Sequence, residues 1–461
     1  EDRTPIWSKD EQAVFYLSER SGSFNVWEMP LGKEAATKQL TNFNTNPVRF
    51  LTVSSTNELC FAYDGEIYTM TPGSQPKKLA VELQVVDNNN TQKTEIYTDG
   101  ANEMAVSPNG KEIAFIVHGE VFVVNAEGGT TKRVTNTPEE ERNISFSPDG
   151  NAILYASERD GIWGIYETRK VRKEDAYFYS STLLKEETLV KTSNESFLPK
   201  YSPDGKEIAF LENRTAVSIY TVATKTIRNV LAANRNYSYS DGDQGFNWSP
   251  DSKYLLVNFL QEGNWHEQIG LIDVTGKQPM VALTQNGFSN SGAKFQMNGK
   301  MMLWFSDRNG MKNVASHGAQ SDAYGLFFTQ ESYDLFKMKK EDYALWKEQK
   351  ETAEKEKEKS KKTAKETSGN KKEKKDTTAK VSPLAIEFNG IENRRARLTE
   401  HSSFLQDAFL SNDGEKVYYF TSFEDGANLW VRNFKENETK MLIKLNAGGI
   451  WSMSQDKDAK N

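Results

Sequence analysis

The hydrophobic residues of this chain fall in short runs that alternate with polar, turn-forming clusters. A representative stretch is Phe146-Ser147-Pro148-Asp149-Gly150, which is followed by the apolar residues 152–156. Proline presets its own backbone angle, aspartate bonds nearby backbone amides, and glycine accepts the positive φ that closes a tight turn. The flanking β-branched and aromatic residues favour strands. The stretch therefore predicts two antiparallel strands joined by a tight turn.

This strand-turn-strand pattern recurs along the chain. The turn serine or its equivalent stands at positions 107, 147, 202, 249, 296, 411 and 454, and a weaker copy stands at position 8. The first spacings are 40, 55, 47 and 47 residues. Several copies continue into a second turn, a third strand with Trp or Tyr, and a fourth strand that ends in Leu-Thr or a near equivalent. Four strands in about 40 to 50 residues make one blade of a β-propeller. The sequence predicts an all-β propeller of four-stranded blades, with seven blades.

The repeat weakens between residues 81 and 102, which include a run of one aspartate and three asparagines at 87–90. Polar clusters of this kind mark loops. We therefore predict that residues 1–90 are the last blades of a first propeller, and that residues 91–461 form a seven-bladed propeller whose last blade is incomplete. A truncated blade would leave unpaired strand edges, so we expect the chain to be a segment of a longer protein. One irregular eight-bladed ring that begins at Pro5 is the alternative.

The gap of 115 residues between positions 296 and 411 indicates an insertion at 337–382. Residues 339–380 contain 15 Lys and 10 Asp plus Glu, a local net charge of +5. The aromatic residues Tyr333, Phe336, Tyr343 and Trp346 precede the charge run and predict a short helix packed on the blade. Beyond Lys350 almost no apolar residue remains to offset the entropy of ordering the chain. We expect a helix that gives way to a disordered loop; a polybasic arm for an acidic partner is the alternative.

Charge and composition exclude several classes of protein. The formal net charge is -7, which gives no electrostatic support to a nucleic-acid partner. No apolar run approaches the roughly 18 to 20 residues of a transmembrane helix. The single cysteine, Cys60, lies in a strand-like run and cannot form a disulfide within the chain.

The sequence contains no recognisable catalytic, cofactor or metal constellation, and we predict none. It has no Gly-x-Ser-x-Gly elbow and no phosphate-binding Gly-Lys-Ser/Thr loop. The four histidines are not spaced as metal ligands; they are His118, His266, His317 and His401. The repeated Asp149, Asp204 and Asp251 each occupy a separate turn, so we interpret them as turn formers rather than calcium ligands.

Several segments resemble tricorn-type serine proteases. Residues 4–27 are similar to the end of the first propeller of that family, and residues 105–122 and 135–142 are similar to the start of its second, seven-bladed propeller. The most specific likeness lies in residues 315–328 and 388–394. The resemblance covers essentially the whole chain. The Ser-Pro-Asp-Gly repeats alone would be weak evidence for this family, because many TolB-like propellers carry them.

The resemblance implies a non-catalytic part of a large peptidase that trims oligopeptides. In that family two propellers filter and channel substrates to PDZ-like and peptidase domains, which bear the nucleophilic serine and a histidine and follow the second propeller. It further implies a homo-oligomer and a cytoplasmic location, with the periplasm as the alternative. No catalytic residue is carried over to this chain, and the Lys-rich insertion leaves the role of His317 open. The competing interpretations are a TolB-like protein-binding module without peptidase activity and, less favoured, the propeller of a prolyl-oligopeptidase-like enzyme.

Overall fold

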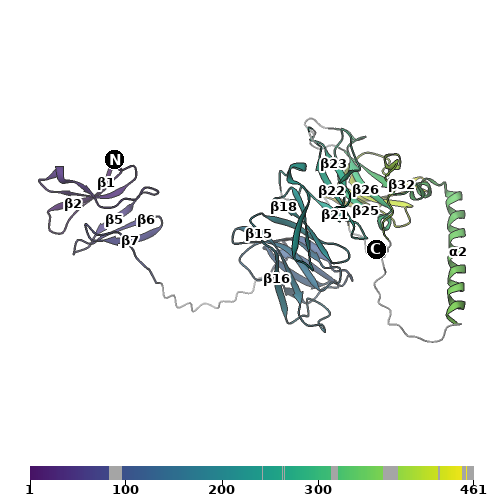
Figure 1. Ribbon diagram of the computed structural model, residues 1–461, viewed down its shortest axis with the longest axis horizontal. Coiled ribbons are helices and arrows are strands. Elements are labelled where there is room, and N and C mark those ends of the chain that lie inside the picture. Colours follow the sequence, from purple (N-terminus) through teal and green to yellow (C-terminus); the bar gives the residue numbers. More distant parts are fainter. Residues whose placement is uncertain are drawn as a thin grey trace. The chain divides into compact units, whose positions relative to one another are not determined.

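In the computed structural model the described residues form eight four-stranded antiparallel sheets and two α-helices (Figure 1). The structure describes residues 1–82, 96–240, 242–261, 263, 265–312, 320–366, 383–423, 426–448 and 453. The chain divides into two compact units, Glu1–Ile96 and Tyr97–Asn461. The predicted all-β architecture of four-stranded sheets is confirmed.

The first unit contains two sheets. Their strands are β1 (Asp2–Trp7), β2 (Ala13–Ser18), β3 (Asn25–Pro30) and β4 (Lys38–Gln39) in one sheet, and β5 (Arg49–Val53), β6 (Leu59–Tyr63), β7 (Glu66–Met70) and β8 (Lys77–Lys78) in the other. A shared core that includes Phe15, Val26, Leu59 and Phe61 joins the two sheets. The assignment of this unit to a first propeller stays a prediction.

The second unit contains six sheets in its described part, and in each the strands lie in chain order. The strands of the first three sheets are β9 (Ala101–Val106), β10 (Glu112–Val117), β11 (Glu120–Asn125) and β12 (Thr131–Arg133); β13 (Glu141–Phe146), β14 (Ala152–Arg159), β15 (Ile162–Lys170) and β16 (Leu184–Val190); and β17 (Ser196–Tyr201), β18 (Glu207–Glu212), β19 (Ala216–Thr221) and β20 (Thr226–Leu231).

The last three sheets of this unit follow the same plan. Their strands are β21 (Phe246–Trp248), β22 (Tyr254–Leu260), β23 (Glu267–Asp273) and β24 (Val281–Ala282); β25 (Asn290–Gln296), β26 (Met301–Ser306), β27 (Asp322–Phe327) and β28 (Arg395–Arg397); and β29 (Phe404–Leu410), β30 (Lys416–Ser422), β31 (Ala427–Asn433) and β32 (Glu438–Ala447). The seventh repeat, predicted at position 454, lies outside the described residues, as do residues 83–95 of the predicted boundary region at 81–102.

The Ser-Pro-Asp-Gly segments form the predicted tight turns between first and second strands. The amide of Gly150 donates to the carbonyl of Ser147 at 2.9 Å, and Gly150 has a φ of 70°. The Ser147 hydroxyl donates to the Asp149 carboxylate at 2.5 Å and accepts from the amide of Ala152 at 2.9 Å. The strands β13 and β14 then pair in antiparallel register. The local chemistry of the turn therefore sets the start of each sheet.

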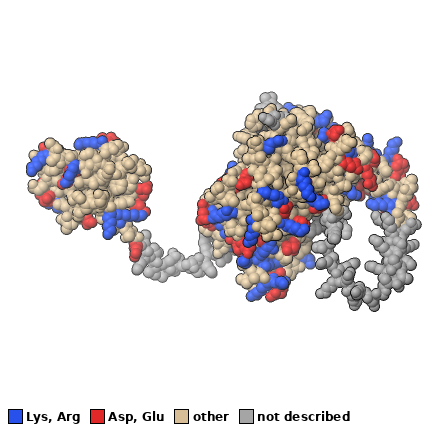
Figure 2. Space-filling view, viewed as in Figure 1, with Lys and Arg blue, Asp and Glu red and all other residues tan. Residues whose placement is uncertain are grey.

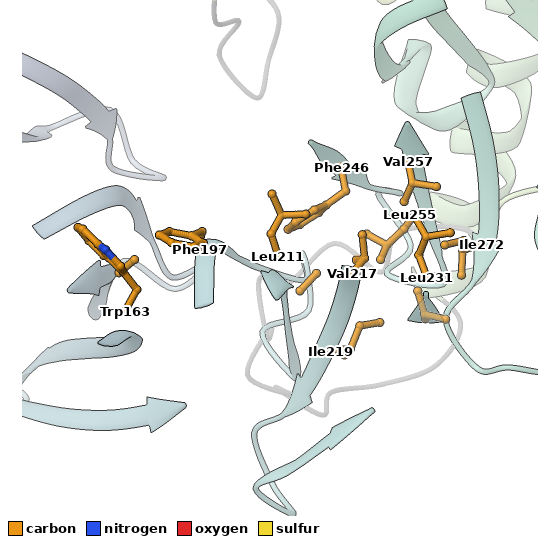
Figure 3. Packing of buried hydrophobic residues seen from close by; sticks show 13 residues of the cluster. Trp163, Phe197, Leu211, Val217, Ile219, Leu231, Phe246, Leu255, Val257 and Ile272 are labelled. Atoms are coloured by element: carbon orange, nitrogen blue, oxygen red, sulfur yellow. The ribbon is translucent and has the colours of Figure 1, made fainter. Parts of the chain in front are cut away.

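Consecutive sheets of the second unit pack face to face around shared apolar clusters. Figure 3 shows a cluster of 13 buried residues, with Trp163 and Phe197 at one end and Leu255, Val257 and Ile272 at the other. The rings of Trp163 and Phe197 lie 5.5 Å apart. Because a fully buried side chain of this size stabilises the fold by roughly 1.5 to 3 kcal/mol, these clusters fix the stacking of the sheets.

The insertion begins as two helices, α1 (Gln330–Lys337) and α2 (Lys340–Glu366). Thr329 caps α1 by accepting a hydrogen bond from the amide of Ser332 at 3.2 Å. The helix α2 continues well beyond Lys350, further than we expected. Lysine, glutamate and alanine have high helix propensity, and pairs such as Lys355 and Glu351, 4.0 Å apart, add support at i,i+4 spacing. The rest of the predicted insertion, residues 367–382, lies outside the described residues.

Acidic and basic residues are interspersed on the visible surface of both units (Figure 2). This mixture agrees with the modest net charge and shows no extended basic patch on that face. Neither helix in the described part of the chain has the length and apolar character needed to span a bilayer.

Candidate functional site

The first strands of the six sheets in the second unit lie next to one another in chain order. The Glu103 carboxylate on β9 accepts a hydrogen bond from the amide of Ile144 on β13 at 3.2 Å. The Asn143 side chain on β13 accepts from the amide of Leu198 on β17 at 2.9 Å. A side chain of one first strand therefore reaches the backbone of the next.

The series continues through the remaining sheets. The indole of Trp248 on β21 donates to the carbonyl of Lys200 on β17 at 3.1 Å, and Asn247 donates to the carbonyl of Ala293 on β25 at 2.9 Å. On β25, Gln296 accepts from the amide of Leu410 on β29 at 3.0 Å. We call these six strands, β9, β13, β17, β21, β25 and β29, the inner strands. Their contacts join the six sheets in series, as in the successive blades of a propeller.

Most inner strands carry an irregularity at the same point. The pairing register shifts between Arg142 and Ser145 on β13, and between Phe197 and Lys200 on β17. At these bulges Asn143 and Leu198 adopt φ values of 58° and 51°. A non-glycine residue at positive φ is uncommon and needs support from its surroundings. Here the Asn143 side chain supplies that support, because it binds the Leu198 amide.

The inner strands carry charges of both signs. Lys294 on β25 forms an ion pair with Asp407 on β29, and the second oxygen of Asp407 accepts from the amide of Met453 at 2.6 Å. Burial lowers the pKa of Lys200, and the positive charge of Lys294 lowers that pKa further. Burial raises the pKa of the Glu103 carboxyl, although backbone hydrogen bonds oppose this shift. The inner strands are therefore polar, with Lys200 near Lys294, and Lys294 paired with Asp407.

The residues considered in the sequence for metal binding do not converge. Asp149, Asp204 and Asp251 each accept a hydrogen bond from the serine of their own turn, at 2.5, 2.7 and 2.7 Å. Within the residues that the structure describes, no group of three or more His, Cys, Asp or Glu side chains could hold a metal ion. His317 lies outside the described residues, and Cys60 is a free, half-buried thiol.

The polar residues of the inner strands were not predicted from the sequence. Their only signal is a polar side chain in the strand before each Ser-Pro-Asp-Gly turn, such as Lys200 or Asn247. Arg394, which belongs to the motif at 388–394, is buried and donates to the main-chain carbonyls of Phe327 and Asn389 at 3.0 and 3.1 Å. The motif therefore anchors the return from the insertion to β27.

The stacked four-stranded sheets and the series of inner-strand contacts define a protein of the β-propeller class. Residues 77–344, more than half of the chain, match the family model of the dipeptidyl peptidase IV (DPP IV) N-terminal region. The chain belongs to this family.

Two further comparisons confirm the resemblance to tricorn-type proteases. The chain is 23% identical over 306 residues to a protein of Sulfurisphaera tokodaii described as a tricorn-like protease C-terminal subunit, covering 66% of this chain and 33% of that protein. It is 12% identical to the crystal structure of the tricorn protease, with a TM-score of 0.56, covering 96% of this chain and 39% of that chain. The structural likeness shows the fold alone.

A TolB structure from Acinetobacter baumannii also matches the chain, at 15% identity and a TM-score of 0.33, over 68% of this chain and 76% of that chain. The chain spans 33% of the length of the curated tricorn-like relative from Sulfurisphaera tokodaii. The family model and the two tricorn relatives carry the names of different peptidases.

Proposed function

We propose that this chain is the non-catalytic propeller region of a tricorn-like serine peptidase, which admits extended oligopeptides along its inner strands to a catalytic region elsewhere in the full-length protein. The observation that carries the proposal is the continuous series of contacts between the inner strands of six consecutive sheets. Sheets arranged around a common line leave a narrow axial passage, which accommodates an extended chain and excludes a folded domain.

The chemistry of the inner strands supports a peptide as the substrate. An extended peptide presents a polar backbone and side chains of varied charge, and the inner strands carry side-chain amides and charges of both signs. This mixture of groups on the inner strands does not favour one peptide side chain. It suits a filter that admits substrates by their size and extended conformation. Assembly into a homo-oligomer, contact with PDZ-like and peptidase domains, and a cytoplasmic location remain predictions from the resemblance.

The proposal is tested with the full-length protein and a small folded substrate of known cleavage site. We expect cleavage of a short fluorogenic peptide and of the reduced, unfolded substrate, but not of the same substrate when folded. This chain alone is expected to cleave neither. Equal cleavage of the folded and unfolded forms would refute the filter, and cleavage by this chain alone would show that it carries catalytic residues.

A protein-binding module is the second candidate, because three aromatic side chains cluster on the surface of the fourth sheet of the second unit. Tyr237, Tyr239 and Trp265 are 46%, 81% and 73% exposed, and the Tyr237 ring lies 4.6 Å from Tyr239 and 5.7 Å from Trp265. Exposed aromatic residues are enriched in protein interfaces. Under this alternative, the double substitution Tyr239→Ser and Trp265→Ser abolishes partner binding. Under the peptidase proposal it leaves cleavage of short peptides unchanged.

A further inference from the structure

A small pocket lies beside the fifth sheet of the second unit, next to the end of β24. Its volume is about 100 Å³, and it is lined by Asn286, Asn290, Trp304, Ser306, Arg308, Tyr324, Arg395, Ala396 and Arg397. Trp304 and Tyr324 are buried, and their stacked rings lie 5.4 Å apart. Pockets for whole organic ligands measure roughly 300 to 1,000 Å³. This one has room only for a small polar group.

Three arginines line this pocket, and only one of them has an acidic partner among the described residues. Arg397 pairs with Asp322 at 2.8 Å, and Thr399 and Ser402 also donate to Asp322 at 2.7 Å each. Arg308 lies over the Phe288 ring at 5.6 Å. Arg395 donates from one terminal nitrogen to the carbonyl of Leu283 at 2.6 Å. The pocket therefore carries an excess of positive charge.

Arg395 is held in an electrostatically unfavourable position. Its Nε is buried and has no hydrogen-bond partner. Burial lowers the pKa of its guanidinium, and the like charge of Arg308 opposes ionisation as well, while Glu392 partly compensates. A buried donor without a partner costs about 1 to 3 kcal/mol. An anion in the pocket would offset this cost, and the planar guanidinium fork matches the geometry of carboxylates and phosphates.

We propose that this pocket binds a small oxyanion between Arg308 and Arg395, beside Trp304. The shared chemistry is that of a peptide carboxylate or a phosphate group. The peptide source rests on the proposed function, whereas the oxyanion site itself does not. Bound at this position, a peptide carboxylate would hold one end of a substrate at the side of the propeller.

Isothermal titration calorimetry on the whole chain tests this site with three probes: acetyl-trialanine with a free carboxylate, the same peptide as its C-terminal amide, and inorganic phosphate. We expect the free acid to bind about tenfold more tightly than the amide, the equivalent of one charge-assisted hydrogen bond. Arg308→Ala removes an exposed side chain and should keep the fold. It is expected to weaken binding of the free acid about tenfold.

The matched control is Arg235→Ala, because Arg235 also lies over an aromatic ring, that of Phe259 at 5.2 Å, but outside the pocket. It should bind all probes as the wild type does. The double variant Arg308→Ala with Arg395→Gln should bind no anion, with circular dichroism as the check on folding. Binding of phosphate without the free acid would support the oxyanion site and refute the peptide source. Equal, measurable binding of acid and amide without binding of phosphate, or unchanged binding of the anions by both variants, would overturn the site whatever the outcome of the cleavage assay.

Discussion

Arg394 holds the return from the insertion to the fifth sheet of the second unit, and its removal gives a sharp prediction. The buried guanidinium donates to the carbonyls of Phe327 at 3.0 Å, Asn389 at 3.1 Å and Phe328 at 3.3 Å, and also to Glu387. The substitution Arg394→Met keeps most of the side-chain volume and removes every donor. We expect it to loosen residues 387–391 and the adjacent end of β27.

The size of the effect follows from what each carbonyl retains. The carbonyl of Phe328 still accepts from the amide of Glu387 at 2.9 Å, and those of Glu387 and Asn389 belong to exposed residues, where water can replace the arginine. The Phe327 carbonyl lies in a fully buried residue and loses its charged donor. A hydrogen bond to a charged group contributes about 1.5 to 3 kcal/mol, so we expect Arg394→Met to lower the free energy of unfolding by about that amount.

The assay is guanidinium unfolding followed by tryptophan fluorescence, with hydrogen exchange of the amides in β27 and residues 387–391. Arg394→Lys retains the charge but not the planar guanidinium fork, so its denaturation midpoint should lie between those of the wild type and Arg394→Met. The exposed Arg235→Met is the control and should change the free energy of unfolding by less than about 0.5 kcal/mol. An Arg394→Met midpoint equal to that of the wild type would refute the reasoning.

Three further predictions concern charged groups of the second unit. Lys435 donates to three carbonyls at the end of α1, at 2.9 to 3.0 Å, so Lys435→Met should release the two helices and speed proteolysis at 330–350. The exposed Lys440→Met should not. Burial lowers the pKa of Lys200 in the folded chain. Below the unfolded pKa of about 10.4, the unfolded chain therefore binds more protons than the folded chain, and the free energy of unfolding should rise with pH up to that value. In Lys200→Met this part of the pH dependence of the denaturation midpoint should vanish. Parallel plots of midpoint against pH for the wild type and Lys200→Met would contradict this prediction. Asp407→Asn breaks the ion pair with the partly exposed Lys294 and should cost about 1 to 3 kcal/mol, measured by denaturation; no loss would mean that the pair does not join β25 to β29.

The repeated turns could be predicted because their chemistry is local. Ser147, Asp149 and Gly150 satisfy one another within a few residues, so the sequence alone indicates both the turn and the hairpin around it. Repetition of the turn then predicts the architecture. The same locality explains why Asp149 could be interpreted as a turn former rather than a metal ligand.

The inner-strand contacts and the arginine pocket could not be predicted, because they depend on pairing between sheets. Leu198 adopts a positive φ that its residue type disfavours, and only the bond from Asn143, 55 positions earlier, explains it. Arg308 and Arg395 are separated in the sequence by the whole insertion, and no spacing rule joins them. Lys435 likewise contacts the end of α1, where Leu335 lies 100 positions earlier in the chain.

The central claim is that peptides travel along the inner strands, and photo-crosslinking tests it most directly. An extended oligopeptide with one benzoylphenylalanine is irradiated with the full-length protein, and the modified residues are mapped by mass spectrometry. The account predicts adducts on β9, β13, β17, β21, β25 and β29, which excess unlabelled peptide suppresses. Adducts confined to outer strands such as β20 and β32, or to the aromatic cluster of Tyr237, Tyr239 and Trp265, would contradict it.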